Sequence, residues 1–256
     1  LPLPKITVSA KVEFTNTEDG TVTVTDPSGE TVAPKEDKTY TLTETGKYAY
    51  TVTGMEQYKD VNGSFEIGKG DDGKVKTISV PHEYKEVELK GTGTQDEPIL
   101  ISNALELRAF ANKVNSGDSA AAHAYVKLTD NIIVPGSWTP LGKNTDSPFS
   151  GHFDGDGHSI TGMSITFDSD DKSIGAPYLG LFGYVKGTAD KKAEIKNLML
   201  SGKLDITENY RNSFAYSGGL VGGAEYVSFT DITTNVAVTA KKGSAPYPWS
   251  YVGGFA

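Results

Sequence analysis

The sequence contains no cysteine in its 256 residues. This absence excludes disulfide frameworks, thiol nucleophiles, iron–sulfur clusters and zinc sites built on cysteine. A chain of this length can form two domains of ordinary size, each with its own apolar core. The fold therefore has to be held by apolar burial and backbone hydrogen bonding rather than by covalent crosslinks.

Clustered positive charge and long apolar runs are also missing. The formal net charge is −9, and residues 1–88 and 89–256 are both acidic. Binding to nucleic acid or to an anionic membrane surface needs clustered cations, so we expect neither as a partner. No apolar run approaches the roughly 18 residues of a membrane span, and we expect no membrane insertion. The chain begins at Leu1 without methionine or a basic leader, which predicts a mature or trimmed form.

What the sequence does have is the composition of short strands joined by tight turns. It contains 29 glycines and 13 tyrosines, with many threonines and valines among aspartate, asparagine and serine. Such residues favour strands and the turns between them. The composition predicts an all-β protein.

Residues 1–88 show the alternation of apolar and polar residues that is typical of half-buried strands. The predicted strands cover residues 5–8, 21–24, 48–52 and 75–80, and turns are predicted at 26–29, 45–46, 61–63 and 71–73. Elements at this spacing predict an antiparallel sandwich of six or seven strands. We assign residues 1–88 to this first domain.

Part of this domain resembles a family of small bacterial modules. The pattern is Asp-Pro-Ser-Gly at 26–29, Gly-Lys-Tyr-Ala-Tyr-Thr-Val at 46–52, and a further glycine before Ser-Phe-Glu-Ile at 64–67. It resembles the immunoglobulin-like or carboxypeptidase-regulatory-like modules of surface proteins. The resemblance implies a spacer or stalk.

A charged connector at 81–89 leads to the one strongly predicted helix. Asn103 is the expected N-cap, with Glu106 completing a capping box, and Gly117 is the expected stop. One apolar stripe follows from the helical spacing of Leu107, Phe110, Ala111 and Val114. We expect this helix to cover the open end of a strand-rich array.

The array is predicted from internal repeats. The string 178–183 recurs at 217–223 and at 252–256, with Gly180, Gly219 and Gly254 separated by 39 and 35 positions. A second element at 160–165 matches 195–200 after 35 positions, and 229–232 more weakly. Periods of this size indicate stacked supersecondary units.

These repeats resemble the GLUG motif of bacterial surface and secreted proteins, whose core is Gly-Leu-Phe/Val-Gly. The lead-in strings at 91–102, 125–132, 138–142 and 149–160 extend the resemblance from about Gly91 to the C-terminus, and we assign residues 89–256 to this second domain. The resemblance implies a right-handed parallel β-helix of the pectin-lyase-like kind with an N-terminal capping helix, in a large multidomain protein. Because the chain stops within the third repeat, we expect the native protein to continue.

Some proteins with GLUG repeats are metallopeptidases directed at immunoglobulins, but no activity transfers with the motif. Their zinc motif, His-Glu-x-x-His, is missing here. The most similar string, at residues 82–86, lacks the second histidine and falls in the predicted connector. We therefore predict no peptidase site in this chain.

Two segments are candidates for binding a metal ion. His152, Asp154, Asp156 and His158 alternate, so on a straight strand they would share a face and could hold zinc or calcium. The alternative is a turn at Gly155 and Gly157 between inward-facing Phe153 and Ile160. The acidic run at 168–172 could bind calcium, or it could be a solvated loop without the converging oxygens that calcium needs.

Aromatic residues near the C-terminus are the candidates for ligand binding. Tyr247, Trp249 and Tyr251 could present flat stacking surfaces to sugars, with weaker candidates at Trp138, Tyr210 and Tyr216. The alternative is that Trp138 packs in the core and that the tyrosines cover the outer faces of the repeats.

We predict no catalytic residue and no cofactor. The only arginines are Arg108 and Arg211, no carboxylate pair is singled out by spacing, and phosphate-binding and serine-hydrolase motifs do not occur. The predicted function is a non-catalytic, extracellular or surface-attached adhesion, binding or stalk module of Gram-positive type, monomeric, recognising glycans or host proteins. The alternative is a polysaccharide lyase or glycoside hydrolase that uses a groove of the β-helix.

Overall fold

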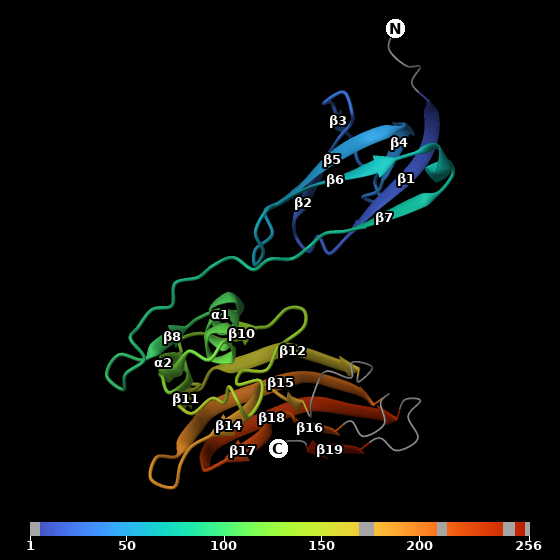
Figure 1. Cartoon of the computed structure of the whole chain (residues 1–256). Coiled ribbons are helices and arrows are strands. Elements are labelled where there is room, and N and C mark those ends of the chain that lie inside the picture. The colour runs from blue at the N-terminus through green and yellow to red at the C-terminus, as the bar shows by residue number, and fades with distance from the viewer. Residues whose placement is uncertain (1–5, 169–176, 209–213, 243–248, 254–256) are drawn as a thin grey trace. The chain divides into compact units, whose positions relative to one another are not determined.

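The computed structural model describes residues 6–168, 177–208, 214–242 and 249–253, and these residues form a mostly β-stranded protein. The prediction of the all-β class is confirmed. The chain divides into two compact units, Leu1–Glu86 and Val87–Ala256. The sequence analysis had placed the boundary between residues 88 and 89. Figure 1 labels most of the elements of both units.

Unit 1 consists of two small sheets and one short 3₁₀ helix. The sheets have the strand orders β4-β1-β7 and β3-β2-β5-β6. The elements are β1 (Thr7–Thr15), β2 (Thr21–Thr25), β3 (Thr31–Val32), β4 (Tyr40–Glu44), β5 (Gly46–Thr53), β6 (Val61–Ile67), η1 (Lys69–Asp71) and β7 (Val75–Ser79).

The buried side chains of both sheets join in one apolar cluster. On β1 the alternate residues Val8, Ala10 and Val12 are buried, and β5 contributes Tyr48, Tyr50 and Val52. The expectation of wholly antiparallel sheets is wrong at one place, since β1 pairs with β7 in parallel. The long connection between these strands, which carries the whole second sheet, lets β7 return to the edge of β1 in the same direction.

The predicted turn at 61–63 is wrong, because these residues open strand β6. Gly63 pairs with Tyr50 on β5, and a side chain at position 63 would overlap the ring of that tyrosine. The glycine is needed for the close approach of a buried aromatic ring rather than for a turn. The predicted turn at 26–29 is confirmed, with the amide of Gly29 donating to the carbonyl of Asp26 at 3.0 Å.

Residues 82–86 were predicted to belong to a connector, but residues 82–84 contact residues 58 and 59 of unit 1. Tyr84 forms an antiparallel bridge with Tyr58, and the ring of His82 stacks on Tyr58 with centroids 3.9 Å apart. Lys59 donates to Glu83 at 2.6 Å. This histidine and its neighbours therefore have structural partners.

In unit 2 the predicted helix, α1 (Ala104–Asn115), follows strand β8 (Ile99–Ile101) and precedes α2 (Ser119–Ala122). The Asn103 side chain accepts from the amide of Glu106 at 3.0 Å, which confirms the N-cap. The reciprocal half of the box differs from the prediction, since the Glu106 carboxylate accepts from the amide of Ser102 at 2.7 Å. The apolar stripe is buried as predicted and belongs to the core of the unit.

Parallel pairing dominates the strands of unit 2. All pairs of strands in its described residues are parallel, and the largest sheet has the order β10-β12-β15-β11-β9-β8, with β18 paired to β15. Two smaller sheets have the orders β13-β16-β19 and β14-β17. The strands are β8 (Ile99–Ile101), β9 (Tyr125–Leu128), β10 (Ile132–Ile133), β11 (His152–Asp154), β12 (Ser159–Asp168), β13 (Tyr178–Leu179), β14 (Phe182–Lys186), β15 (Ala193–Glu208), β16 (Phe214–Gly218), β17 (Val221–Glu225), β18 (Val227–Lys242) and β19 (Trp249–Gly253).

The register of these strands tests the predicted repeats. Phe182 pairs with Val221 and Gly218 with Gly253, as the alignment of the glycine-rich strings requires. Tyr178 and Leu179 pair with Tyr216 and Ser217, one position before the residues that the alignment predicts. The match between 160–165 and 195–200 is wrong, since Ile195 pairs with Phe153 and Ile160 pairs with Leu200. The paired residues are 42 positions apart before the turn at Asp156 and Gly157 and 40 positions apart after it, because this turn adds two residues to the earlier copy. The predicted spacing of 35 positions is therefore too short on both sides of the turn.

The core of unit 2 consists of the inward-facing residues of successive strands. Val126, Phe153 and Ile195 occupy one row and are at most 2% exposed. Trp138 is also buried, and its indole N–H donates to the carbonyl of Leu181 at 3.0 Å. The core alternative for Trp138 is therefore the correct one.

Replacing Phe153 with alanine should lower the free energy of unfolding of unit 2 by about 3 to 5 kcal/mol, because the change leaves a large cavity in a closely packed row. Both tryptophans, Trp138 and Trp249, belong to unit 2. Urea denaturation followed by tryptophan fluorescence therefore reports on this unit. The control is Ile133→Ala, at a side chain that is 73% exposed, which should change stability by less than about 0.5 kcal/mol. Equal effects of the two substitutions would contradict the described core.

Replacing Gly63 with alanine should destabilise unit 1 by about 1 to 3 kcal/mol, because the added methyl group displaces the Tyr50 ring. Differential scanning calorimetry measures the effect. Gly70→Ala is the matched control, since a side chain there meets open space. If position 63 tolerated alanine as well as position 70 does, the pairing of Gly63 with Tyr50 would be incorrect.

Candidate functional site

The outward side chains of β9, β11 and β15 form two polar rows. Each strand contributes a polar–apolar–polar triplet, whose central residue is buried and whose flanking residues face outward. In-register parallel pairing places His152 beside Tyr125 and Glu194, and places Asp154 beside Lys127 and Lys196. The local alternation and the register together bring these six residues to one surface.

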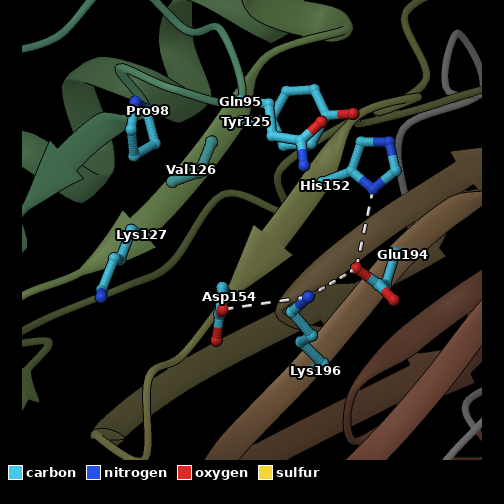
Figure 2. A pocket seen from close by; sticks show the side chains of 9 residues that line it. All are labelled: Gln95, Pro98, Tyr125, Val126, Lys127, His152, Asp154, Glu194 and Lys196. Carbon is cyan, nitrogen blue, oxygen red and sulfur yellow. Dashed lines mark hydrogen bonds and ion pairs between the residues drawn. The ribbon is translucent and has the colours of Figure 1, made fainter.

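Tyr125 and His152 form a stacked aromatic pair on this surface, in which each ring covers one face of the other. This pair is called the platform from here on. Their ring centroids are 4.2 Å apart and the ring planes differ by 8°. The platform borders a pocket of about 320 Å³ that both polar rows and Gln95 line. Figure 2 shows Gln95 beside Tyr125, with His152 directed toward Glu194. The amides of Thr92 and Gly93 donate to the carbonyl of Glu97 at 3.0 Å and so close the loop that carries Gln95.

The carboxylates of the pocket are bound to neighbouring groups. Lys196 is 2.9 Å from Glu194 and 4.0 Å from Asp154, and His152 is 3.7 Å from Glu194 (Figure 2). The hydrogen bond to Glu194 raises the pKa of Lys196, so the ammonium stays charged. Asp154 also accepts from the side-chain amide of Asn197 at 2.9 Å. One lysine thus contacts both carboxylates.

A second pocket, of about 680 Å³, lies on the other side of the platform. Tyr125 and His152 line it as well, together with His123, Ser150 and the segment 186–192. A tight turn holds this segment, since the amide of Thr188 donates to the carbonyl of Lys191 at 2.7 Å. The two pockets and their shared platform are called the groove from here on.

One wall of the groove is fixed by a buried tyrosine. The Tyr184 hydroxyl donates to Glu225, which is also 3.1 Å from the Lys186 ammonium. Burial, and then the bond to Glu225, raises the pKa of Tyr184 to about 12. The same bond, followed by the contact with Lys186, lowers the pKa of Glu225. Lys186 therefore has a fixed anionic partner at the rim.

The four residues of the predicted metal site do not share one face. His152 and Asp154 face outward on β11, but Asp156 has φ +50° in a turn and is 2.9 Å from Lys127. The turn closes with the amide of His158 donating to Gly155 at 2.8 Å, and a side chain at Gly155 would overlap the carbonyl of Asn197. The turn interpretation is confirmed. In the described parts of the chain there is no group of three or more metal-ligating side chains.

The other predicted sites lie partly outside the described residues. Residues 169–172 of the acidic run, with Tyr210, Arg211 and Tyr247, fall there. Trp249 belongs to β19. Tyr251 is 56% exposed and stacks on Tyr216 with centroids 5.1 Å apart, and Tyr216 stacks on Tyr178 at the same distance.

The sequence analysis missed most of the groove. Tyr125, Lys127, Glu194 and Lys196 were not singled out, and neither were the lysines of 186–192. The signal was present in the polar–apolar–polar triplets at 125–127, 152–154 and 194–196. Their unequal spacing along the chain hid the register, because the segments between them differ in length.

Comparisons with known proteins show partial likeness. No protein-family model matches the chain, and no solved structure matches it. The chain is 31% identical over 113 residues to a "Putative Gly-rich membrane protein" of Evansella cellulosilytica, covering 44% of this chain and 12% of that protein. It is 29% identical over 162 residues to the halomucin of Haloquadratum walsbyi, covering 58% of this chain and 2% of that protein. The chain thus spans a small part of the length of both relatives.

Among the described residues, neither helix has the length and apolar character needed to cross a membrane.

Tyr184 should ionise well above the ordinary tyrosine pKa of 10. Its raised pKa favours the protonated form in the folded state, so its contribution to stability is present below pH 10 and is lost as the pH rises through about 12. Spectrophotometric titration of tyrosinate absorbance should show a component near pH 12 that Tyr184→Phe removes. Tyr226→Phe, at an exposed position, should leave that component in place. Persistence of the component in the Tyr184 variant would show that another tyrosine gives rise to it.

Proposed function

We propose that this chain is a non-catalytic binding module of a surface protein and that it recognises glycans through the groove. The observation that carries the proposal is the half-buried Tyr125–His152 platform, which lines both pockets. Sugar rings present apolar C–H faces, and flat aromatic surfaces with one accessible side are suited to stack against them.

Polar groups around the platform can form hydrogen bonds with the hydroxyl groups of a sugar. Gln95, Lys127 and Lys196 line the smaller pocket and can donate hydrogen bonds. The pocket volumes, about 320 and 680 Å³, fall in the range of small-ligand sites. A few polar groups around an aromatic surface are the usual composition of such sites.

We further propose that unit 2 is a right-handed parallel β-helix with GLUG repeats and that unit 1 is an immunoglobulin-like sandwich. Parallel strands that repeat their register across three sheets support the first assignment. Two sheets around one apolar cluster support the second. The proposed location is extracellular or at the cell surface. Partial likeness to proteins named as a membrane protein and a halomucin supports that location.

Catalysis by a polysaccharide lyase or glycoside hydrolase has less support in the groove. General acid–base catalysis needs a carboxyl group that is free to take up and release a proton. Asp154 and Glu194 share Lys196 as a partner, and Asp154 also caps the turn that follows it. These contacts favour a structural role for both carboxylates.

The Tyr125→Ala variant tests the proposal. A glycan array probed with the full chain should identify a binding sugar, and titration calorimetry with that sugar should show affinity about tenfold weaker in the variant, since one stacking contact is lost. Tyr251→Ala is the matched control, because Tyr251 is an exposed, stacked tyrosine outside the groove.

Tryptophan-monitored unfolding should confirm that both variants remain folded. Weaker binding in Tyr251→Ala alone would transfer the site to the tyrosine stack of β13, β16 and β19. The absence of any glycan ligand for the full chain would refute glycan recognition.

A further inference from the structure

The larger pocket of the groove carries an excess of positive charge in an acidic protein. Its lining includes three lysines, at 186, 191 and 192. Asp190 is the one carboxylate among the lining residues. The chain as a whole has a net charge of −9, so this concentration of cations in one concavity departs from the rest of the sequence.

Two of these lysines keep their charge available. The third lysine, Lys186, forms an ion pair with Glu225, with its Nζ atom 3.1 Å from the carboxylate. For Lys191 and Lys192, the described residues provide no ion pair, and both side chains are exposed. Lys191 ends the Thr188–Lys191 turn, in which its amide donates to the Thr188 hydroxyl at 3.0 Å, and Lys192 directly precedes strand β15. The pocket therefore presents two unneutralised ammonium groups on a segment of fixed backbone.

The aromatic platform lines the same pocket as these lysines, since Tyr125 and His152 border it together with Lys191 and Lys192. A ligand that fills the pocket can therefore contact an aromatic ring and positive charge together. An acidic sugar has both complementary features, since its ring carries a C–H face and its substituent carries the negative charge.

We infer that the ligand of the groove is an anionic polysaccharide, with a sugar ring on the Tyr125–His152 platform and its sulfate or carboxylate group at Lys191 and Lys192. This inference rests on the proposed function and specifies the ligand class of the same groove.

Single-stranded nucleic acid is the other polyanion that aromatic platforms and cations bind. It requires a positive groove that follows several successive phosphates. Here Glu225, Glu194 and Asp154 border the platform and the lysines, so positive charge is confined to one pocket. A saccharide with charge on individual rings suits this arrangement better than a continuous phosphate backbone.

The test compares polymers that differ only in charge. Dextran sulfate and carboxymethyl dextran share a glucose backbone with neutral dextran, and binding of each to the full chain is measured by biolayer interferometry. The inference predicts that at least one charged polymer binds at least about tenfold more tightly than dextran, and that added salt weakens this preference.

The double variant Lys191→Gln/Lys192→Gln should lose most of the preference for the charged polymer, about tenfold in affinity, while leaving weak dextran binding unchanged. The matched control is Lys113→Gln/Lys241→Gln, which removes the same charge from exposed positions of unit 2 outside the groove. A loss caused only by the lower net charge would appear equally in both double variants and would overturn the inference.

Two further outcomes separate this inference from the proposed function. If neutral glycans bind in a Tyr125-dependent way but charged polymers gain nothing, the ligand class is wrong and glycan recognition stands. If single-stranded DNA competes as well as dextran sulfate does, the saccharide assignment is overturned. If no saccharide binds at all, both proposals fail.

Discussion

In-register parallel pairing of β9, β11, β15 and β18 is the constraint on which the rest of unit 2 depends. Backbone hydrogen bonds fix which residue of each strand lies beside which residue of the next. Because side chains alternate between the faces of a strand, one register creates inward and outward rows together. A shift by one residue would expose Phe153 and bury His152 and Asp154. The apolar core therefore holds the groove in place.

The outward rows also satisfy the electrostatic requirements of close parallel strands. Lys127, Asp154 and Lys196 alternate in sign across neighbouring strands. Opposite charges at paired positions stabilise a sheet by about 0.2 to 1 kcal/mol each, whereas like charges destabilise it. The carboxylates of the groove thus have a structural role in strand pairing. The aromatic platform and the lysines without an ion-pair partner among the described residues, Lys191 and Lys192, are the groups available for binding a ligand.

Each outward row ends where its strand bends, and the bend is made by a residue with positive φ. Asn197 and Asp231 both have positive φ, and the register places their neighbours side by side on β15 and β18. After strand β11 the bend is instead a turn formed by Asp156 and Gly157, which both have positive φ. The chain leaves the outward row at this bend, which is why Asp156 and His158 do not extend the row that His152 and Asp154 begin.

The sequence by itself determined the all-β class, the capped helix α1, several strands of unit 1 and the pairing of the glycine-rich repeats. These features depend on local signals, namely alternation, capping residues and a repeated string, and each can be read within a short window. Only the tertiary structure decided the parallel placement of β7, the strand at Gly63 and the composition of the groove. Those features depend on which distant segments meet, and segments of unequal length between the strands conceal that register. The tyrosine opposite Gly63 and the row that joins Tyr125, His152 and Glu194 exist only after the chain has folded.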